Sequence, residues 1–512
     1  MPTPISGIRS TLPPRLRTLL AAATLLFAIA APAQTPTQTP SQSPAKDKTI
    51  PALFLSDIHF DPFHDPSKAT QLAAAPIADW NTILSAPDSP DQSQAFAHLQ
   101  QTCGSRGADT PYVLLQSSLQ AIRANAADAR FTTLSGDLLA HAFHCRYTAT
   151  IPTGTPDSYN QFLAKTIHYL VTQLQSALPG RPLYLALGNN DTNCGDYQLD
   201  PGGSFLALTR DSIAAALPPN PSRRRALADF TAMGNYSITL PAPLHRTRLI
   251  VLDDIFLSRR YSSCASQPNP AAITQQLTWL RMQLAQARRH HQTVWVLGHI
   301  PPGVDFYATF RKMLNLCSGA QPVTFLSSDQ LPDTLVDNAD IVRLAIFGHT
   351  HMDELRLFAP EPGQSHSPHA GPVPIKMVSS ISPVNGNLPT FTMARIDPAT
   401  ATLADYQVIS ASNLTGVQAL WSSQYTFTEA HHQPTFSPAP LAELLHLFST
   451  DPEANTDSSQ AYIRHYFPGD RSALIKPLWP QYTCSLAHYT AQAFTACACA
   501  QSSPTSSTAA GK

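Results

Sequence analysis

Apolar residues along the chain follow two patterns, one typical of buried strands and the other of helices. Short apolar runs predict strands over 53–55, 131–134, 183–187, 293–297 and 342–347, with two more strand candidates between 236 and 254. Apolar residues three and four positions apart predict helices over 112–130, 163–174 and 273–284. Because strands alternate with helices, we expect βαβ units, a largely parallel central sheet and an α/β fold.

The pattern changes in the last third of the chain. The runs at 375–378 and 391–396 alternate more between apolar and polar residues, and we expect both in a second, partly antiparallel sheet. Beyond about residue 430, short apolar segments at 441–445 and 461–467 predict a small helical region that also carries cysteines. The sequence therefore predicts a main α/β domain followed by a few helices.

The first residues of the chain have the pattern of a secretory signal peptide, predicted over residues 1–33. Three arginines precede a short apolar run over 19–31, and Ala31-Pro32-Ala33 offers a small-residue cleavage site. An uncleaved membrane anchor is the less favoured interpretation, because a spanning helix needs about 20 apolar residues. We therefore expect an exported protein, periplasmic or secreted.

Composition divides the rest of the chain into four parts. These are a disordered linker over 34–48, a main domain over 49–430, a helical cysteine-bearing region over 431–500 and a disordered tail over 501–512. Within the main domain, the stretch from the end of the first strand to about residue 110 is too irregular to assign to elements.

Charge and cysteine content narrow the class of protein. The net charge is -1, so no global field indicates binding to nucleic acid or to an acidic membrane surface. The chain has 8 cysteines, and an even number in an exported protein predicts disulfides whose pairing the spacing leaves open. We expect these cysteines to be structural rather than redox-active.

Polar side chains follow five of the predicted strands, at the point where each strand ends. They are Asp57 with His59, Asp137 with His141, Asn189, His299, and His349 with His351. Ligands collect at the carboxyl ends of strands in α/β sheets, so we expect these groups to converge. Each residue alone could be a turn, capping or packing residue, but five coincidences in this order favour a metal site.

The donor types indicate which metals such a site would hold. Carboxylate, carboxamide and imidazole groups together suit Zn, with Mn or Fe as alternatives. These candidate ligands exceed the four of one tetrahedral site, and a shared carboxylate would let them hold two ions. Two such ions can supply hydroxide and clamp the attacking and leaving oxygens of a displacement at phosphorus.

These motifs resemble a known family. The ordered set Asp-x-His, Gly-Asp, Gly-Asn-x-Asp, Gly-His and Gly-His-x-His is similar to the calcineurin-like metallophosphoesterase superfamily. The segments at 56–61, 298–303, 348–354, 379–391 and 421–430 resemble its acid sphingomyelinase-like branch in particular. The resemblance implies a sandwich of two mixed β-sheets flanked by helices, formed by the main domain, with a small helical C-terminal region.

The resemblance also implies roles for single residues. One metal would be held by Asp57, His59, Asp137 and His351, and the other by Asp137, Asn189, His299 and His349. His141 corresponds to the family's proton donor for the leaving group. Cys264 and Cys317 flank the His299 motif much as a family disulfide does, so the resemblance implies that they pair.

One position departs from the family pattern. Many members have His after the ligand Asn, whereas this chain has Asn190, which can donate a hydrogen bond to the transition state but cannot act as an acid. The resulting Gly-Asn-Asn-Asp motif also resembles endopolyphosphatase-like members of the branch. This weakens sphingomyelin as the assumed substrate and leaves the phosphoester class intact.

The expected function is therefore that of an exported dimetal phosphodiesterase that uses metal-bound hydroxide. Its substrate would be a lipid headgroup ester or a nucleotide-like diester, with transient membrane-surface contact left open. A polyphosphate or phosphoanhydride hydrolase is the alternative within enzymes, and a non-catalytic metal-stabilised binding module is the alternative of another class.

Overall fold

The structure is a computed structural model that describes residues 49–361, 363–469 and 475–502. The predicted signal peptide and the whole of the predicted linker lie outside the described residues. The last helix continues to Ser502, so it extends two residues into the predicted tail, and the rest of that tail also lies outside the description. No described helix is both long enough and apolar enough to span a bilayer.

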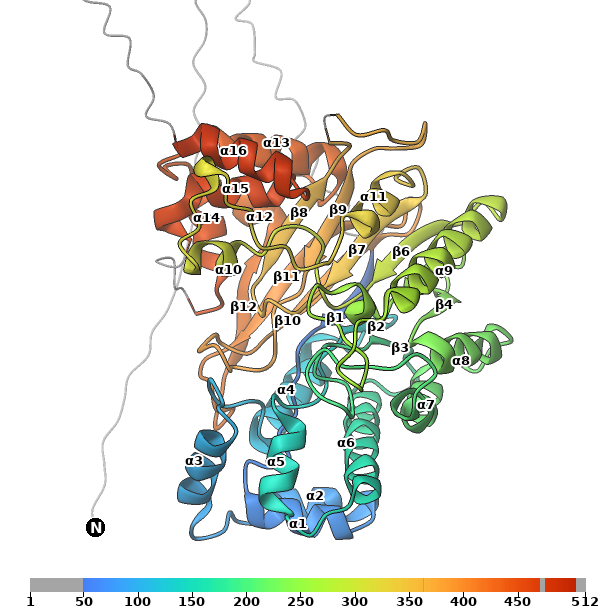
Figure 1. Cartoon of the computed structure of the whole chain (residues 1–512), viewed down its shortest axis with the longest axis vertical. Coiled ribbons are helices and arrows are strands. Elements are labelled where there is room, and N and C mark those ends of the chain that lie inside the picture. The colour runs from blue at the N-terminus through green and yellow to red at the C-terminus, as the bar shows by residue number, and fades with distance from the viewer. Residues whose placement is uncertain (1–48, 362, 470–474, 503–512) are drawn as a thin grey trace, which may run out of the picture. The chain divides into compact units, whose positions relative to one another are not determined.

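Twelve strands form two mixed sheets of six strands each (Figure 1). The first sheet has the order β12 (Trp421–Thr426), β11 (Thr402–Ala411), β10 (Thr390–Asp397), β1 (Ile50–Leu55), β2 (Thr132–Ser135) and β3 (Leu183–Ala186). Here β1, β2 and β3 are parallel, and the other neighbours are antiparallel. The second sheet has the order β4 (Tyr236–Thr239), β5 (Thr247–Val251), β6 (Thr293–Leu297), β7 (Val342–Phe347), β9 (Val373–Met377) and β8 (Glu354–Phe358). In it β5, β6, β7 and β9 are parallel.

Helices lie in the connections between strands and after the last strand. Those of the main domain are α1 (Pro66–Ala74), α2 (Trp80–Ser85), α3 (Gln92–Thr102), α4 (Tyr112–Asn125), α5 (Phe143–Thr150), α6 (Pro156–Ala177), α7 (Ser204–Ala216), α8 (Ser222–Met233), α9 (Pro270–Arg289), α10 (Phe306–Arg311) and α11 (Gln330–Val336). The C-terminal ones are α12 (Phe427–His431), α13 (Pro438–Ser449), α14 (Asp457–Tyr466), α15 (Trp479–Ala487) and α16 (Ala491–Ser502). Short 3₁₀ helices are η2 (Ile77–Asp79), η3 (Asp254–Leu257), η4 (Leu316–Ser318) and η6 (Lys476–Leu478).

The two sheets pack against each other through large buried side chains. Trp295 of β6 is fully buried, and its ring meets Phe54 of β1 edge-on at a centroid distance of 6.1 Å and Phe131, just before β2, at 6.0 Å. The indole nitrogen of Trp295 donates to the carbonyl oxygen of Ala401 at 2.7 Å, which satisfies its polar end. The two-sheet sandwich expected from the motifs is therefore confirmed.

The prediction of sheet membership was wrong in two respects. The parallel strands do not form one central sheet but are divided between the two sheets, with β1–β3 in one and β5–β7 in the other. Residues 375–378 and 391–396, expected in the same second sheet, lie in β9 of the second sheet and β10 of the first. The periodicity of apolar residues indicates which face of a strand is buried, but it does not indicate which other strands it pairs with.

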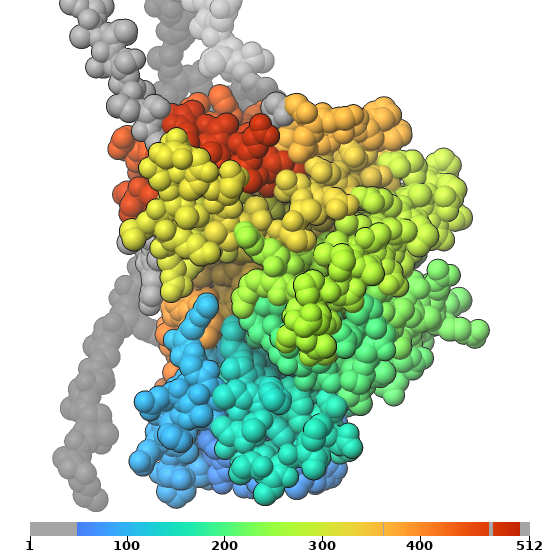
Figure 2. Space-filling model, in the orientation of Figure 1, coloured from blue at the N-terminus to red at the C-terminus, as the bar shows by residue number. Residues whose placement is uncertain are grey.

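Four disulfides pair all eight cysteines, and the implied pair of Cys264 with Cys317 is wrong. Cys264 bonds to Cys194, because the loop after β3 runs beside the segment after β5, where Gln198 and Ser262 form an isolated bridge. Cys317 bonds to Cys499 of α16. Figure 2 shows the yellow segment that contains α10 against the red C-terminal helices.

Candidate metal centre

The carboxyl ends of β1, β2, β3, β6 and β7 meet at one place and carry the predicted site residues. The backbone N–H of Asp57 donates to the carbonyl oxygen of Gly136 at 3.1 Å, joining the ends of β1 and β2. His299 Nδ1 lies 2.6 Å from the carbonyl oxygen of Ser135, which joins the second sheet to the first. Gly348 N–H donates to the His299 carbonyl at 2.9 Å. The site thus lies between the two sheets, at the carboxyl ends of their strands, where ligands are expected in α/β folds.

The first group of predicted ligands is Asp57, His59, Asp137 and His351. His59 Nε2 lies 3.7 Å from Asp57 Oδ1 and 3.3 Å from Asp137 Oδ2. His351 Nε2 lies 3.4 Å from Asp57 Oδ1. His59 Nδ1 donates to the carbonyl oxygen of Leu139 at 2.8 Å, so the lone pair of Nε2 is left facing the carboxylates.

The second group is Asp137, Asn189, His299 and His349. Asn189 Oδ1 lies 3.0 Å from His299 Nε2 and 2.9 Å from His349 Nδ1. Asp137 Oδ2 lies 3.3 Å from His299 Nε2, the same distance as from His59 Nε2 in the first group. Asp137 therefore stands between the two groups, where a shared carboxylate would have to be. Metal coordination by these seven residues remains a prediction.

These residues fit divalent cations because some of their buried polar atoms accept or donate no hydrogen bond within the described residues. Asp57 Oδ1 and His59 Nε2 have no hydrogen-bond partner among the described residues, although both side chains are fully buried. An unsatisfied buried polar atom costs about 1–3 kcal/mol, more when it is charged. Asp57, His59 and Asp137 each place one ligand atom within 4.8 Å of the others. A cation would satisfy atoms that the protein leaves unpaired.

The electrostatics of the site also favour positive charge. Burial lowers the pKa of His299, but the carboxylates of Asp137, Asp57 and Asp254 together outweigh burial and raise this pKa to about 10. Burial also lowers the pKa of His59, and the carboxylates of Asp137, Asp57 and Asp109 together raise it to about 9. Burial and the neighbouring His299 instead lower the pKa of His349 to about 3. The carboxylates thus stabilise the protonated, positively charged form of the imidazoles beside them. Metal ions at the same place would supply that positive charge instead.

The backbone at the ligands is held in an uncommon conformation. Five ligand residues have left-handed φ values between 45° and 71°: Asp57, His59, Asp137, His349 and His351. Such strain costs about 1–3 kcal/mol per residue and concentrates at functional sites. Gly348 permits the close approach of strand ends, because a Cβ there would lie 1.9 Å from Ser56 Oγ. The surrounding structure therefore holds these loops in place.

Two buried carboxylates outside the predicted set support the ligand loops. Asp191 accepts backbone N–H groups from Leu138 and Gly188, each at 2.9 Å. Asp254 accepts the N–H of His299 at 2.9 Å. Burial raises the pKa of each carboxyl to about 7. Asp191 is the last residue of the Gly-Asn-x-Asp motif, whereas Asp254 belongs to none of the motifs found in the sequence.

A third carboxylate orients the carboxamide ligand. Asn189 Nδ2 donates to Asp196 Oδ1 at 2.7 Å, which turns Asn189 Oδ1 toward the two histidines of its group. Arg260 donates to the other oxygen of Asp196 at 3.0 Å and stacks over Tyr197 at 4.0 Å from the ring centroid. Tyr197 Oη lies 3.2 Å from His349 Nε2. Only tertiary structure brings these residues together.

His141, the predicted proton donor, lies beside the first group. Its ring stacks on that of His59 with a centroid distance of 4.0 Å, and one of its nitrogens lies within 4.8 Å of ligand nitrogens of His59 and His351. Its side chain is 35% exposed, whereas His59 is fully buried, so His141 can meet a substrate. Its Nδ1 lies 2.9 Å from Oδ1 of Asp109, a residue that sequence reasoning missed.

Asn190 makes a different contact from the one expected of it. Its backbone N–H donates to Asp137 Oδ1 and its Nδ2 donates to Asp137 Oδ2, both at 2.9 Å. The side chain thus holds the central carboxylate. A role for Asn190 at the transition state remains a prediction.

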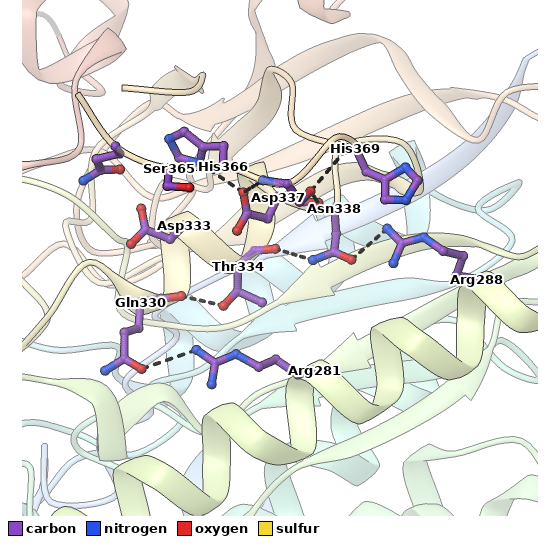
Figure 3. A pocket seen from close by; sticks show the side chains of 12 residues that line it. Arg281, Arg288, Gln330, Asp333, Thr334, Asp337, Asn338, Ser365, His366 and His369 are labelled. Carbon is purple, nitrogen blue, oxygen red and sulfur yellow. Dashed lines mark hydrogen bonds and ion pairs between the residues drawn. The ribbon is translucent and has the colours of Figure 1, made fainter. Parts of the chain in front are cut away.

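A cavity of about 650 Å³ lies between α9, α11 and the segment over 364–369 (Figure 3). Its polar groups bind one another, with Arg281 donating to Gln330 and Arg288 pairing with Asp340 beside the cavity. None of the predicted metal ligands lines this cavity. It is therefore separate from the candidate metal centre.

Comparisons with known proteins give relatives at low identity. No family model matches the chain. The chain is 24% identical over 417 residues to mouse acid sphingomyelinase-like phosphodiesterase 3b, covering 78% of this chain and 79% of the relative. It is 23% identical over 355 residues to sphingomyelinase phosphodiesterase C of Dictyostelium discoideum, covering 66% and 71%. Human cyclic GMP-AMP phosphodiesterase SMPDL3A is 22% identical over 368 residues, covering 70% and 72%.

Among solved structures, a dimetal phosphatase from Danio rerio has a TM-score of 0.37 and 11% identity, covering 74% of this chain and 100% of that chain. The calcineurin-like phosphoesterase YfkN from Bacillus subtilis has a TM-score of 0.31 and 11% identity, covering 78% and 96%. The sequence relatives above all carry the name of phosphodiesterases.

Proposed function

We propose that this chain, a member of the acid sphingomyelinase-like branch of the calcineurin-like metallophosphoesterases, is a metal-dependent phosphodiesterase. The observation that carries the proposal is the position of Asp137 Oδ2, 3.3 Å from His59 Nε2 on one side and 3.3 Å from His299 Nε2 on the other. A carboxylate shared between two sets of donors suits two cations held close together.

The seven ligands would hold two divalent ions, and we propose zinc because four of them are imidazoles. When bound, the ions supply a hydroxide nucleophile and offset the charge that develops on the phosphate oxygens. The protein's own part is to orient the donors: Leu139 and Ser135 accept from Nδ1 of His59 and His299, which leaves each Nε2 for the site. His141, half-exposed beside the first group, protonates the departing oxygen.

The substrate that we propose is a phosphodiester, either a lipid headgroup ester or a nucleotide-like diester. A diester retains one charge on phosphorus and leaves an alkoxide that needs a proton, which matches a site with one exposed histidine beside the ligands. The three sequence relatives support this class by name, and their low identity leaves the particular ester to experiment.

We also propose that the protein is exported. Four disulfides join all of its cysteines, and such bonds persist in oxidising compartments rather than in a reducing cytosol. Sequencing the amino terminus of the protein recovered outside the cytoplasm tests this. A mature chain that starts at Gln34 supports a cleaved signal peptide, and a chain retained whole in the cytoplasm contradicts it.

The test of activity compares bis-p-nitrophenyl phosphate with p-nitrophenyl phosphate on protein loaded with Zn, Mn or Fe. We expect the diester to turn over and a chelator to abolish turnover until metal is restored. Asp137→Asn should lower turnover by about a hundredfold or more, because metal ions contribute several kcal/mol to such reactions.

The matched control is Asp340→Asn, which removes a carboxylate paired with Arg288 away from the metal centre. It should leave turnover unchanged. If neither ester reacts with any of the three metals, the phosphodiesterase proposal is wrong. Polyphosphate would then be the next substrate to test. Metal-dependent thermal stability without turnover of either would indicate a binding module.

A further inference from the structure

A buried carboxylate lies directly behind His141. Asp109 Oδ1 is 2.9 Å from His141 Nδ1, and Asp109 Oδ2 accepts the backbone N–H of His141 at 2.9 Å. Asp109 is fully buried, whereas the side chain of His141 is 35% exposed. The same carboxylate therefore holds both the ring and the backbone of this residue, and its bond to Nδ1 leaves Nε2 as the ring nitrogen for a substrate.

Asp109 is itself held by groups from two other parts of the chain. Ser382 Oγ donates to Asp109 Oδ1 at 3.1 Å. Arg146 of α5 is fully buried and lies 3.6 Å from Asp109 Oδ2, and it also donates to Asp61 at 2.6 Å. A buried carboxylate with several donors keeps one orientation, because any rotation would leave buried groups unpaired.

A disulfide cross-links the two segments that carry this network. Cys145, which directly precedes Arg146, bonds to Cys103 at the end of α3. Arg146 Nη2 also donates to Ser105 Oγ at 3.1 Å, in the same loop that leads to Asp109. Helices α3 and α5 lie side by side in the lower part of Figure 1. The disulfide thus fixes α5 to the loop that carries the carboxylate.

We propose that Asp109 is the positioning residue for proton donation by His141, and that Arg146 and the Cys103–Cys145 disulfide hold it in place. This inference rests on the proposed phosphodiesterase function, in which His141 is the proton donor. Asp109 binds the proton on Nδ1, so the proton to be donated is the one on Nε2. That proton passes to the leaving oxygen as the P–O bond breaks, and the ring remains as the neutral Nδ1–H tautomer bonded to Asp109.

A purely structural role for Asp109 would make a different prediction. If its bonds only shape the loop, its loss should slow all diesters alike. If it positions an acid, its loss should matter most for esters whose leaving group needs a proton. The leaving group therefore separates the two roles.

The experiment compares Asp109→Asn with the wild type on bis-p-nitrophenyl phosphate and diphenyl phosphate. The two substrates differ in their leaving groups, since phenolate, whose conjugate acid has a pKa of about 10, leaves far less readily than p-nitrophenolate. General acid catalysis contributes about 10²–10⁴-fold. We expect kcat on the phenyl ester to fall at least about tenfold more than kcat on the nitrophenyl ester. An equal loss on both esters would overturn the inference.

The control is Asp65→Asn, which changes another buried carboxylate of the same region that caps α1 and does not contact His141. It should leave the ratio of the two rates unchanged. Ser382→Ala is the second variant in case Asp109→Asn does not fold, because it removes one donor to Asp109 and should shift the ratio in the same direction. An unchanged ratio in a folded Ser382→Ala protein would count against the inference.

A spectroscopic measurement decides the point without turnover. In ¹⁵N spectra of zinc-loaded protein, with the signal assigned by its loss in His141→Ala, neutral His141 should carry its proton on Nδ1. Asp109→Asn should shift the population toward the Nε2–H tautomer, because an amide group can donate to Nδ1. An unchanged tautomer would overturn the inference. If the wild type hydrolyses neither ester, the proposed function fails, and the tautomer still tests the positioning by Asp109.

Discussion

Replacing Asp196 by alanine should weaken one of the two proposed metal sites and spare the other. Asp196 Oδ1 accepts from Asn189 Nδ2 at 2.7 Å, and this bond decides which end of the carboxamide faces the site. Asn189 is buried, with its Oδ1 at 3.0 Å from His299 Nε2 and 2.9 Å from His349 Nδ1. Without Asp196 the amide is free to turn its nitrogen inward, where it cannot bind a cation.

The magnitude follows from the role of such outer partners. Loss of a group that orients a metal ligand typically costs 10–100-fold in metal affinity, or about 1.4–2.7 kcal/mol. The fold should survive, because the ion pair between Asp196 and Arg260 is largely exposed and contributes about 1 kcal/mol or less. The first group does not contact Asp196, so its affinity should not change.

The assay is isothermal titration of zinc into metal-free protein, which should give two binding steps in the wild type. Asp196→Ala should weaken one step by about 10–100-fold and leave the other within error. Arg260→Ala is the matched control, because it removes the other partner of Asp196 and keeps the bond to Asn189. Equal weakening of both steps, or of neither, would refute the assignment of Asn189 to one site.

Two further predictions concern stability. Gly348→Ala should lower the free energy of unfolding of the metal-free protein by about 2 kcal/mol or more. The reason is that the added Cβ would lie 1.9 Å from Ser56 Oγ and 2.6 Å from Asp57 Oδ2. Urea unfolding measures this change, and an unchanged midpoint would contradict the prediction. Replacing Cys317 and Cys499 by serine should destabilise the protein by about 5 kcal/mol, because this disulfide closes a loop with a separation of 182 residues. Replacing Cys484 and Cys497 should cost about 3 kcal/mol, because their separation is 13 residues. Equal losses in guanidinium unfolding would argue against loop-closure entropy as the origin of the stabilisation.

The strand-end motifs could be predicted because each combines a local signal with a positional rule. An apolar run that ends in Gly-Asp or Gly-His places the polar residue at the carboxyl end of a strand, and parallel strands gather such ends at one edge. The structure accordingly brings Asp57, Asp137 and His349 together, although 292 residues separate the first from the last. No knowledge of the strand order was needed for this, only of the strand direction.

Other parts of the fold lack such a signal. The edge strand β12 is largely polar and half-exposed, so its sequence does not separate it from a loop. Strands β8 and β11 were also missed, as were helices α1, α2 and α3 in the irregular stretch before residue 110. In these segments tertiary packing outweighs local preference.

The carboxylates behind the site were missed for a different reason. Asp109 lies 32 residues before His141, and Asp196 lies 7 residues after Asn189 in a loop without repeating pattern. An aspartate in a loop is most often a turn residue, so its type and place carry little information. The pairing of Cys264 was unpredictable for the same reason, because a disulfide depends on which loops are neighbours in space.

The two missed carboxylates and two of the disulfides are related. Cys194 lies two residues before Asp196, and its bond to Cys264 ties that loop to the segment of Arg260. The Cys103–Cys145 bond does the same for the loop of Asp109 and the helix of Arg146. Loops are the most mobile parts of a fold, yet each of these must hold a side chain to within a fraction of an ångström to orient an amide or an imidazole. A disulfide beside each loop limits the loop's motion and so keeps its carboxylate in place. The oxidising compartment that we propose for this protein would therefore preserve the geometry of the site as well as the stability of the fold.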